Sequence, residues 1–382
     1  MKKKTYLVID LKNKDILDKM ILTAGPSITS REIDYVTDAI TNGHDEHWGD
    51  YIMKFERAFA RYLGVKCAMT TSSCTGAMHL ALRSLGIKEG DEVIVPDMSW
   101  VATASVVTYV GAEPVFADVL KDSWTISPES IRERITGKTK AIIPVHLYGH
   151  PCDMIEIIHI ARNYDLKILE DSAPALGAEY DKRKTGTFGD FAAFSFQGAK
   201  LLSTGEGGML VTDNTELYEK AMHFANHGRV SQGFEINDIG YKYKMSNLQA
   251  AWGLAQLERI NELIEKRVQI YEWYRNELKD TEGLQLNKLS SYMESPIYWM
   301  TSIILNKDFG VTRDELMVEL KKRNIDTRPF FPQMSSFPMF KSYDNPVANY
   351  LGKNGINLPS AHKRTREDII YICNCVKEIL GV

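Results

Sequence analysis

The first half of the sequence alternates short apolar runs, rich in β-branched residues, with segments of helical periodicity. This alternation limits the possible folds more than any other feature, because strands separated by helices form layered α/β domains around a largely parallel sheet. The expected strands are residues 92–95, 114–118, 140–146, 167–170, 191–196 and 208–211. The sequence therefore predicts an α/β fold for this half.

Helical patterns dominate the second half. Helices are expected at residues 246–278, 312–323 and 365–380, in addition to 75–85 and 153–163 in the first half, and strands are expected within 296–305. Thr312 and Thr365 each precede an acidic residue by three positions, which is the spacing of an N-terminal capping pair. The change near residue 250 predicts two domains, residues 1–250 and 251–382.

Charge and composition exclude several classes of protein. The 46 basic and 50 acidic residues give a formal charge of -4, whereas nucleic-acid-binding domains are usually strongly basic, so no nucleic-acid partner is expected. No apolar run is long enough to cross a membrane, so no membrane association is expected. The five cysteines form an odd, sparse set that predicts reduced thiols and a cytoplasmic location. Cysteines and histidines lack metal-ligand spacing, so no metal is expected.

Small hydroxyl residues precede the helix expected at 75–85. The segment Ser73-Cys74-Thr75 runs directly into that helix, whose free N–H groups and positive dipole end favour a phosphate. Ser and Thr at a helix start are more often simple caps, and this segment alone favours the cap.

Asp171 follows the buried strand expected at 167–170. Open α/β sheets bind ligands at the carboxyl ends of their strands, where an acid can hold a metal, a ribose or a protonated ring nitrogen. A strand-ending aspartate that caps the next turn is about equally consistent with the sequence.

Lys200 follows the aromatic strand expected at 191–196 and precedes a glycine-rich turn, 205–208. A lysine held against a sheet can lose its proton and form Schiff bases, although most lysines are solvated surface groups. The glycines are equally consistent with an ordinary hairpin.

The three features together fit one cofactor, pyridoxal 5′-phosphate (PLP). This cofactor needs a phosphate cup, an acid opposite its ring nitrogen, an amine for its aldehyde and a flat group over its ring. Ser195 adds to the cup formed by Ser73, Cys74 and Thr75, and Trp100 can cover the ring. Asp171 and Lys200 are thus the expected catalytic residues, and Lys200 would also move the substrate proton.

Over nearly its whole length the chain resembles the DegT/DnrJ/EryC1/StrS family of sugar aminotransferases. The resemblance rests on Gly90-Asp-Glu-Val-Ile-Val-Pro96, Pro144-Val-His-Leu-Tyr-Gly149, Glu170-Asp171, Phe194-Ser-Phe with Lys200, and Gly205-Glu-Gly-Gly208. Within the family the chain is most similar to perosamine synthetase-like members. This similarity rests on Phe55-Glu56, Gly198 before Lys200, and Thr327-Arg-Pro-Phe-Phe331.

The resemblance implies a fold-type I, aspartate aminotransferase-like PLP enzyme, with a mixed seven-stranded sheet in the large domain and a smaller α+β C-terminal domain. It also implies a homodimer whose active sites lie at the subunit interface. The resemblance places Lys242 in a loop that would reach the active site of the partner chain and contact the PLP there. The family usually has Asn at this position. Family members that deoxygenate sugars have His in place of the lysine that binds the cofactor. Position 200 of this chain is Lys, which favours an aminotransferase.

L-glutamate and a keto sugar, most consistent with a nucleotide-linked 4-keto-6-deoxy sugar, are the substrates that the resemblance implies. The expected substrate-binding residues are His44, Trp48, Gln197, Arg229 and Arg328. Two alternatives stay open at this point. One is an aminotransferase for a small phosphorylated ketone or another keto sugar, and the other is a non-catalytic sugar-binding or sensor protein with the same fold.

Overall fold

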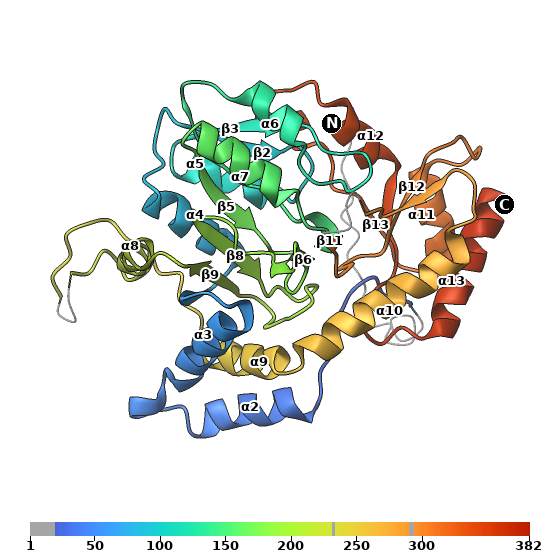
Figure 1. Cartoon of the computed structure of the whole chain (residues 1–382). Helices are drawn as coiled ribbons and strands as arrows, with labels where there is room; N and C mark the ends of the chain where they lie inside the picture. Colours follow the sequence, from blue (N-terminus) through green and yellow to red (C-terminus); the bar gives the residue numbers. More distant parts are fainter. Residues whose placement is uncertain (1–19, 231–233, 290–293) are drawn as a thin grey trace, which may run out of the picture.

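A seven-stranded sheet forms the centre of the molecule in the computed structural model, which describes residues 20–230, 234–289 and 294–382 (Figure 1). Its strand order is β1-β9-β8-β5-β4-β2-β3. β9 runs antiparallel to β1 and β8, and the other neighbours pair in parallel. The strands are β1 (Cys67–Thr71), β2 (Glu92–Pro96), β3 (Glu113–Ala117), β4 (Thr139–Ile142), β5 (Lys167–Asp171), β8 (Phe191–Ser195) and β9 (Gly208–Thr212). This mixed sheet confirms the predicted fold class.

Helices cover both faces of this sheet because side chains alternate along each buried strand. Val93 and Val95 pack with α4 (Cys74–Ser84), α5 (Ala102–Tyr109) and α8 (Thr215–Ala225) on one face. Ile94, between them, packs with α6 (Pro128–Arg134) and α7 (Met154–Asn163) on the other face.

A third group of helices lies near the end of β8. These are α3 (Asp50–Leu63), α9 (Asn247–Leu257), which packs on α3, and α2 (Ser30–Thr41), which packs on α9. Phe59 of α3 lies with its ring centroid 5.1 Å from that of Phe194, and Phe55 lies 5.4 Å from Phe196. These edge-on and tilted contacts fix the strand that leads to Lys200.

The C-terminal part is a smaller α+β unit. Its antiparallel sheet has the order β10-β12-β14-β13, and α10, α11 and α13 share one apolar core with it. The bounds are β10 (Leu284–Leu286), β12 (Ser302–Leu305), β13 (Arg328–Pro329), β14 (Gly355–Asn357), α10 (Ile260–Leu278), α11 (Arg313–Lys322), α12 (Pro346–Asn354) and α13 (Arg366–Leu380). A small sheet adds β6 (Glu179–Tyr180), β7 (Arg183–Lys184) and β11 (Glu294–Ser295). The predicted boundary at residue 250 falls within α9, and the division into residues 1–250 and 251–382 stays a prediction.

Some expected elements differ from those observed. β4 ends at Ile142 rather than 146, because Pro144 has no N–H group to continue the ladder. The strand expected within 296–305 begins only at Ser302, since the N–H of Ile297 bonds to the carbonyl of Gly149 instead of to a neighbouring strand. Both predicted caps are confirmed, because the Thr312 and Thr365 hydroxyls accept the N–H groups of residues 315 and 368.

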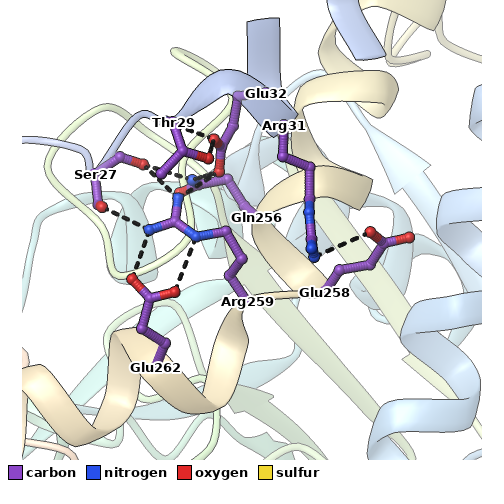
Figure 2. A network of polar contacts seen from close by, with 8 residues as sticks. All are labelled: Ser27, Thr29, Arg31, Glu32, Gln256, Glu258, Arg259 and Glu262. Atoms are coloured by element: carbon purple, nitrogen blue, oxygen red, sulfur yellow. Dashed lines mark hydrogen bonds and ion pairs between the residues drawn. The ribbon is translucent and has the colours of Figure 1, made fainter. Parts of the chain in front are cut away.

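The helix expected at 246–278 is two helices, α9 and α10, and Figure 2 shows the polar network at their junction. The N–H of Arg259 bonds to the carbonyl of Gln256, which tightens the last turn, while its guanidinium lies 2.7 Å from Glu32 of α2 and 2.7 Å from Glu262. Burial would raise the pKa of Glu32, but hydrogen bonds from Thr29, Gln256 and Arg259 outweigh it and lower that pKa to about 2. The break between α9 and α10 therefore places Arg259 where it forms a buried ion pair with Glu32, and this pair holds α2 against the α9–α10 junction.

Candidate active site

The predicted site residues gather at one edge of the large sheet. Asp171 is the last residue of β5, Ser195 is the last residue of β8, and Trp100 follows β2. Gly208, the first residue of β9, pairs with both Ser195 and Thr71. These chain ends meet where the parallel strands finish, which is the usual ligand-binding edge of an open α/β sheet.

Asp171 is a buried carboxylate held by two donors. The hydroxyl of Thr103 donates to its Oδ2 atom at 2.8 Å, and the N–H of Ala173 donates to Oδ1 at 3.2 Å. Burial raises the pKa of Asp171, while Thr103, Lys200 and His146 act in the opposite direction. The carboxylate is thus fixed in place and close enough to Lys200 to interact with its charge.

Lys200 is not a solvated surface lysine. Desolvation by burial lowers the pKa of its amine to about 8, against the opposing effects of Asp171 and Cys74. A tight turn positions it, in which the N–H of Lys200 bonds to the carbonyl of Gln197 and the Gln197 side chain accepts the N–H of Ala199 at 2.9 Å. A lysine of this kind has a substantial neutral fraction near pH 8 and can act as nucleophile or base.

The segment predicted to bind the phosphate lies at the start of α4. The Ser73 hydroxyl caps the helix by accepting the N–H of Gly76 at 3.0 Å, so the cap interpretation of this serine is realised. The N–H groups of Cys74 and Thr75 belong to the first turn and have no preceding turn to bond to. Burial raises the pKa of the Cys74 thiol well above the ordinary value. The charge of Asp171 also raises this pKa, and the charge of Lys200 lowers it. The helix start, the acid and the amine are therefore neighbours.

Gly208 makes this arrangement possible. A Cβ atom at position 208 would lie 2.6 Å from the Cys74 nitrogen and 2.6 Å from the Ser73 carbonyl carbon. Only a residue without a side chain allows β9 to approach the start of α4 so closely.

The outer residues of the predicted site are less enclosed. Trp100 is 63% exposed, and its ring centroid lies 6.0 Å from that of Phe331. Gln197 is exposed beside the Lys200 turn, and exposed Arg328 lies 3.5 Å from Asp326. Trp100, Gln197 and Arg328 are thus open to a ligand.

Four predicted residues are not joined to this cluster. His44 and Trp48 flank the short helix η1 (Asp45–His47) on an exposed segment, Arg229 lies 5.8 Å from the ring of Phe234, and Lys242 is exposed. Among the described residues, no hydrogen bond, ion pair or ring contact links any of these four to Lys200 or Asp171. Their roles stay predictions. Next to Lys242, the carbonyl of Tyr243 accepts the N–H of Ser72 in the same chain.

A second polar network lies behind Asp171 and was not predicted. Nδ1 of buried His146 accepts the N–H of Cys152, so the proton of the ring is on Nε2, 3.0 Å from Glu170. Glu170 also accepts three backbone N–H groups from residues 186, 188 and 189. Glu170 and the segment that contains His146 are both part of the family resemblance, but no local pattern in the sequence indicates that the two side chains meet.

The residues present fit PLP. A desolvated amine, a fixed buried acid and a helix start approached by a glycine lie together, and these are the donors that the aldehyde, the ring nitrogen and the phosphate require. In residues 20–230, 234–289 and 294–382, no group of three His, Cys, Asp or Glu side chains could hold a metal ion. The helices in those same ranges include none that is long and apolar enough to cross a membrane.

Comparison with known proteins confirms the family that the sequence predicts. The sequence model of the DegT/DnrJ/EryC1/StrS aminotransferase family matches residues 26–377. The GDP-perosamine synthase of Escherichia coli O157:H7 is 41% identical over 363 residues, which cover 94% of this chain and 98% of the relative, and that of Vibrio cholerae is 40% identical with the same coverage. The PLP-form of a protein assigned as a sugar aminotransferase in Streptococcus pneumoniae superposes with a TM-score of 0.88 at 28% identity, covering 95% of this chain and 99% of that one.

Proposed function

This chain belongs to the DegT/DnrJ/EryC1/StrS aminotransferase family, and from that premise we propose that it transfers the amino group of L-glutamate to a nucleotide-linked 4-keto-6-deoxy sugar. The chain is a PLP-dependent aminotransferase. Two relatives about 40% identical over most of the chain are GDP-perosamine synthases, which supports a nucleotide-linked sugar as acceptor. The aminotransferase chemistry is supported by one feature of the site, the Lys200 amine, whose pKa is lowered by burial, together with the Asp171 carboxylate that Thr103 and Ala173 hold in place.

The site offers a partner for each part of the cofactor. When bound, PLP supplies an aldehyde that reacts with amines and a ring that accepts electrons from the reacting carbon of the substrate. The start of α4 and the Ser195 hydroxyl would hold the phosphate, and Asp171 would keep a proton on the ring nitrogen. Trp100 would lie flat against the ring, and Lys200 would supply the amine.

Lys200 also suits proton transfer. Because its pKa is lowered to about 8, Nζ can give up and take back a proton near neutral pH at little cost. The negative charge of Asp171 keeps the protonated form accessible despite burial. Nζ would accept the proton from the substrate carbon that carries the amino group and return it on the cofactor side.

Substrate recognition is assigned to the more exposed residues. Gln197 borders the Lys200 turn, and Arg328 projects beside Asp326 with 67% of its side chain exposed. We assign the guanidinium groups of Arg229 and Arg328 to the substrate phosphates, since arginine binds phosphate through two parallel hydrogen bonds. His44 and Trp48 would select among sugars from the segment between α2 and α3.

A homodimer would complete the site. The chain after α8 extends away from the sheet as a long arm (Figure 1). In the described part of this arm Phe234 is 95% exposed and Ile239 is 79% exposed, which is unusual for large apolar side chains that stay in water. Covering them with a second copy would bring Lys242 toward the neighbouring cofactor site.

The thiols support a cytoplasmic location. All five cysteines are free, and four of them are buried. Unpaired cysteines persist where cellular thiols keep proteins reduced. Fractionation of producing cells would place the protein, and recovery mainly from an oxidising compartment would contradict this location.

The acceptor is tested in a single half-reaction. The holoenzyme is treated with L-glutamate until its visible absorbance is bleached, freed of glutamate and then mixed with different ketones. We expect a nucleotide-linked 4-keto-6-deoxy sugar to restore the absorbance at least about 100-fold faster than the same sugar without its nucleotide, since remote binding energy is used in the chemical step. Lys200→Ala is the control without turnover. Faster recovery with a small phosphorylated ketone would contradict the proposal.

A further inference from the structure

The amine of Lys200 lies on the face of a tryptophan from a distant part of the chain. Nζ is 3.8 Å from the ring centroid of Trp299, which is only 6% exposed. The indole Nε1–H donates to the carbonyl of Ala199 at 2.8 Å. The indole is therefore bound to the same turn that carries Lys200, although 100 residues separate it from Ala199.

Several contacts hold Trp299 in place. The N–H of the nearby Ile297 bonds to the carbonyl of Gly149. The backbone at Trp299 also packs closely on Gly149, whose φ is +90°, since a Cβ atom on this glycine would lie 2.7 Å from the backbone nitrogen of Trp299. The indole also stacks on Tyr148, with centroids 6.3 Å apart and planes 26° from parallel. Tyr148 is itself fixed, because its hydroxyl accepts the N–H of Phe331 at 3.1 Å.

Two other ionisable groups lie near the Lys200 amine. Asp171, at the end of β5, attracts the ammonium form. Cys74, at the start of α4, stays a neutral thiol near pH 7 because burial raises its pKa well above the ordinary value. Burial disfavours the ammonium form of Lys200. A further group that binds the ammonium would therefore raise the pKa of this amine measurably.

We propose that Trp299 is a positioning residue that binds the protonated amine of Lys200 on its indole face whenever this amine is not joined to the cofactor. The face of an indole is the strongest aromatic partner for a cation, and its attraction increases when water is excluded. The consequence for turnover rests on the proposed function, in which Lys200 releases the cofactor and returns to it. The binding itself is a property of the chain without cofactor.

The test measures the protonation of Lys200 directly. In cofactor-free protein, competitive labelling with acetic anhydride at a series of pH values, read by peptide mass spectrometry, gives the midpoint of the Lys200 amine. Trp299→Leu keeps an apolar cover but removes the ring, so we expect the midpoint to fall by about one pH unit relative to that of the native protein. In Trp299→Phe, whose ring attracts a cation less strongly, the Lys200 midpoint should lie between those of the native protein and Trp299→Leu. An unchanged or higher midpoint in Trp299→Leu would overturn the proposal.

An internal control is present in the same spectra. Lys266 lies 4.5 Å from the ring of Trp273 in α10 and should keep its midpoint in every Trp299 variant. Parallel shifts of Lys266 and Lys200 would indicate a general change in the protein and would contradict a local role of Trp299.

A second series covers the case in which Trp299→Leu does not fold. Fluorinated tryptophans placed only at position 299 keep the shape and the N–H donor but withdraw electrons from the ring face. The Lys200 midpoint should fall stepwise with the number of fluorine atoms, and a flat series would overturn the proposal. If PLP never binds, the proposed function fails, whereas the labelling series still decides the role of Trp299.

Discussion

Burial acts in opposite directions on the two central residues of the site. It lowers the pKa of the Lys200 amine and raises that of the Asp171 carboxyl, and each residue partly offsets the effect on the other. Thr103 and the N–H of Ala173 add hydrogen bonds to the carboxylate. These hydrogen bonds and the charge of Lys200 favour the ionised form of Asp171, whereas burial disfavours it.

Replacing Asp171 by Asn should separate cofactor binding from chemistry. The amide keeps an oxygen for Thr103 but carries no charge to hold a proton on the ring nitrogen. We expect kcat for L-glutamate to fall by about 100-fold or more, while PLP still binds. Steady-state kinetics and a cofactor titration on the same preparation test this, with the thermal midpoint as the control. Near-native kcat would show that Asp171 does not serve the ring nitrogen.

Local pattern reveals only part of the site at this scale. Lys200 and Asp171 could be predicted because each follows a recognisable buried strand. Thr103 is 68 residues from Asp171, and Trp299 is 100 residues from the carbonyl that binds it. Neither contact has a local sequence signal, because the packing of separate elements creates it.

Among the elements, the contact between β9 and the start of α4 should tolerate no side chain. Gly208→Ala would place a carbon 2.6 Å from backbone atoms of residues 73 and 74, and neither strand nor helix can move without disturbing the sheet. We expect PLP affinity to fall at least about tenfold and unfolding free energy to fall by about 1–3 kcal/mol. Gly137→Ala, which would meet nothing within 4 Å, is the matched control. Equal behaviour of the two variants would refute the close approach.

The buried ion pair between α2 and the α9–α10 junction should govern stability in acid. The folded-state pKa of Glu32 is about 2, below its ordinary 4.5, so its contribution is complete above pH 4.5 and is lost as the pH falls toward 2. Glu32→Gln should lower the unfolding free energy by about 3 kcal/mol at pH 7 and remove part of the decline between pH 4.5 and 2.

The neighbouring Arg31–Glu258 pair, drawn in Figure 2, provides the control, because 47% of the Arg31 side chain and 39% of the Glu258 side chain are exposed. Glu258→Gln should change the unfolding free energy by less than about 1 kcal/mol. Denaturant unfolding at several pH values measures both variants. A Glu32→Gln profile with the same acid slope as the native protein would contradict the role of this ion pair.

Elements with strong local patterns were predicted well, and those set by distant contacts were not. β2, β5 and β9 are buried apolar runs and lie within one residue of their predicted bounds. The break between α9 and α10 could not be predicted, since it serves a contact from Arg259 to a residue 227 positions away. β1, Cys67-Ala-Met-Thr-Thr71, was missed because its short run carries few β-branched apolar residues.

At the scale of the whole molecule, the proposed dimer predicts complementation between two defective chains. Lys200→Ala removes the amine of one site, and Lys242→Ala weakens the loop that would serve the neighbouring site. Mixed dimers, formed by unfolding and refolding the two variants together, should contain one site with both native residues. We expect recovery of about a quarter of native activity, and no recovery from either variant refolded alone. Absence of recovery in mixed dimers verified by mass would place Lys242 in its own chain's site.

The central claim is that Lys200 carries the cofactor, and locating the covalent bond tests it most directly. The PLP-loaded protein is reduced with sodium borohydride, digested and examined by peptide mass spectrometry, with Lys200→Ala treated in parallel. We expect the pyridoxyl mass on the peptide that contains Lys200 and on no corresponding peptide of the variant. A label on a different lysine, or native protein that binds PLP without any reducible bond, would contradict the assignment of Lys200.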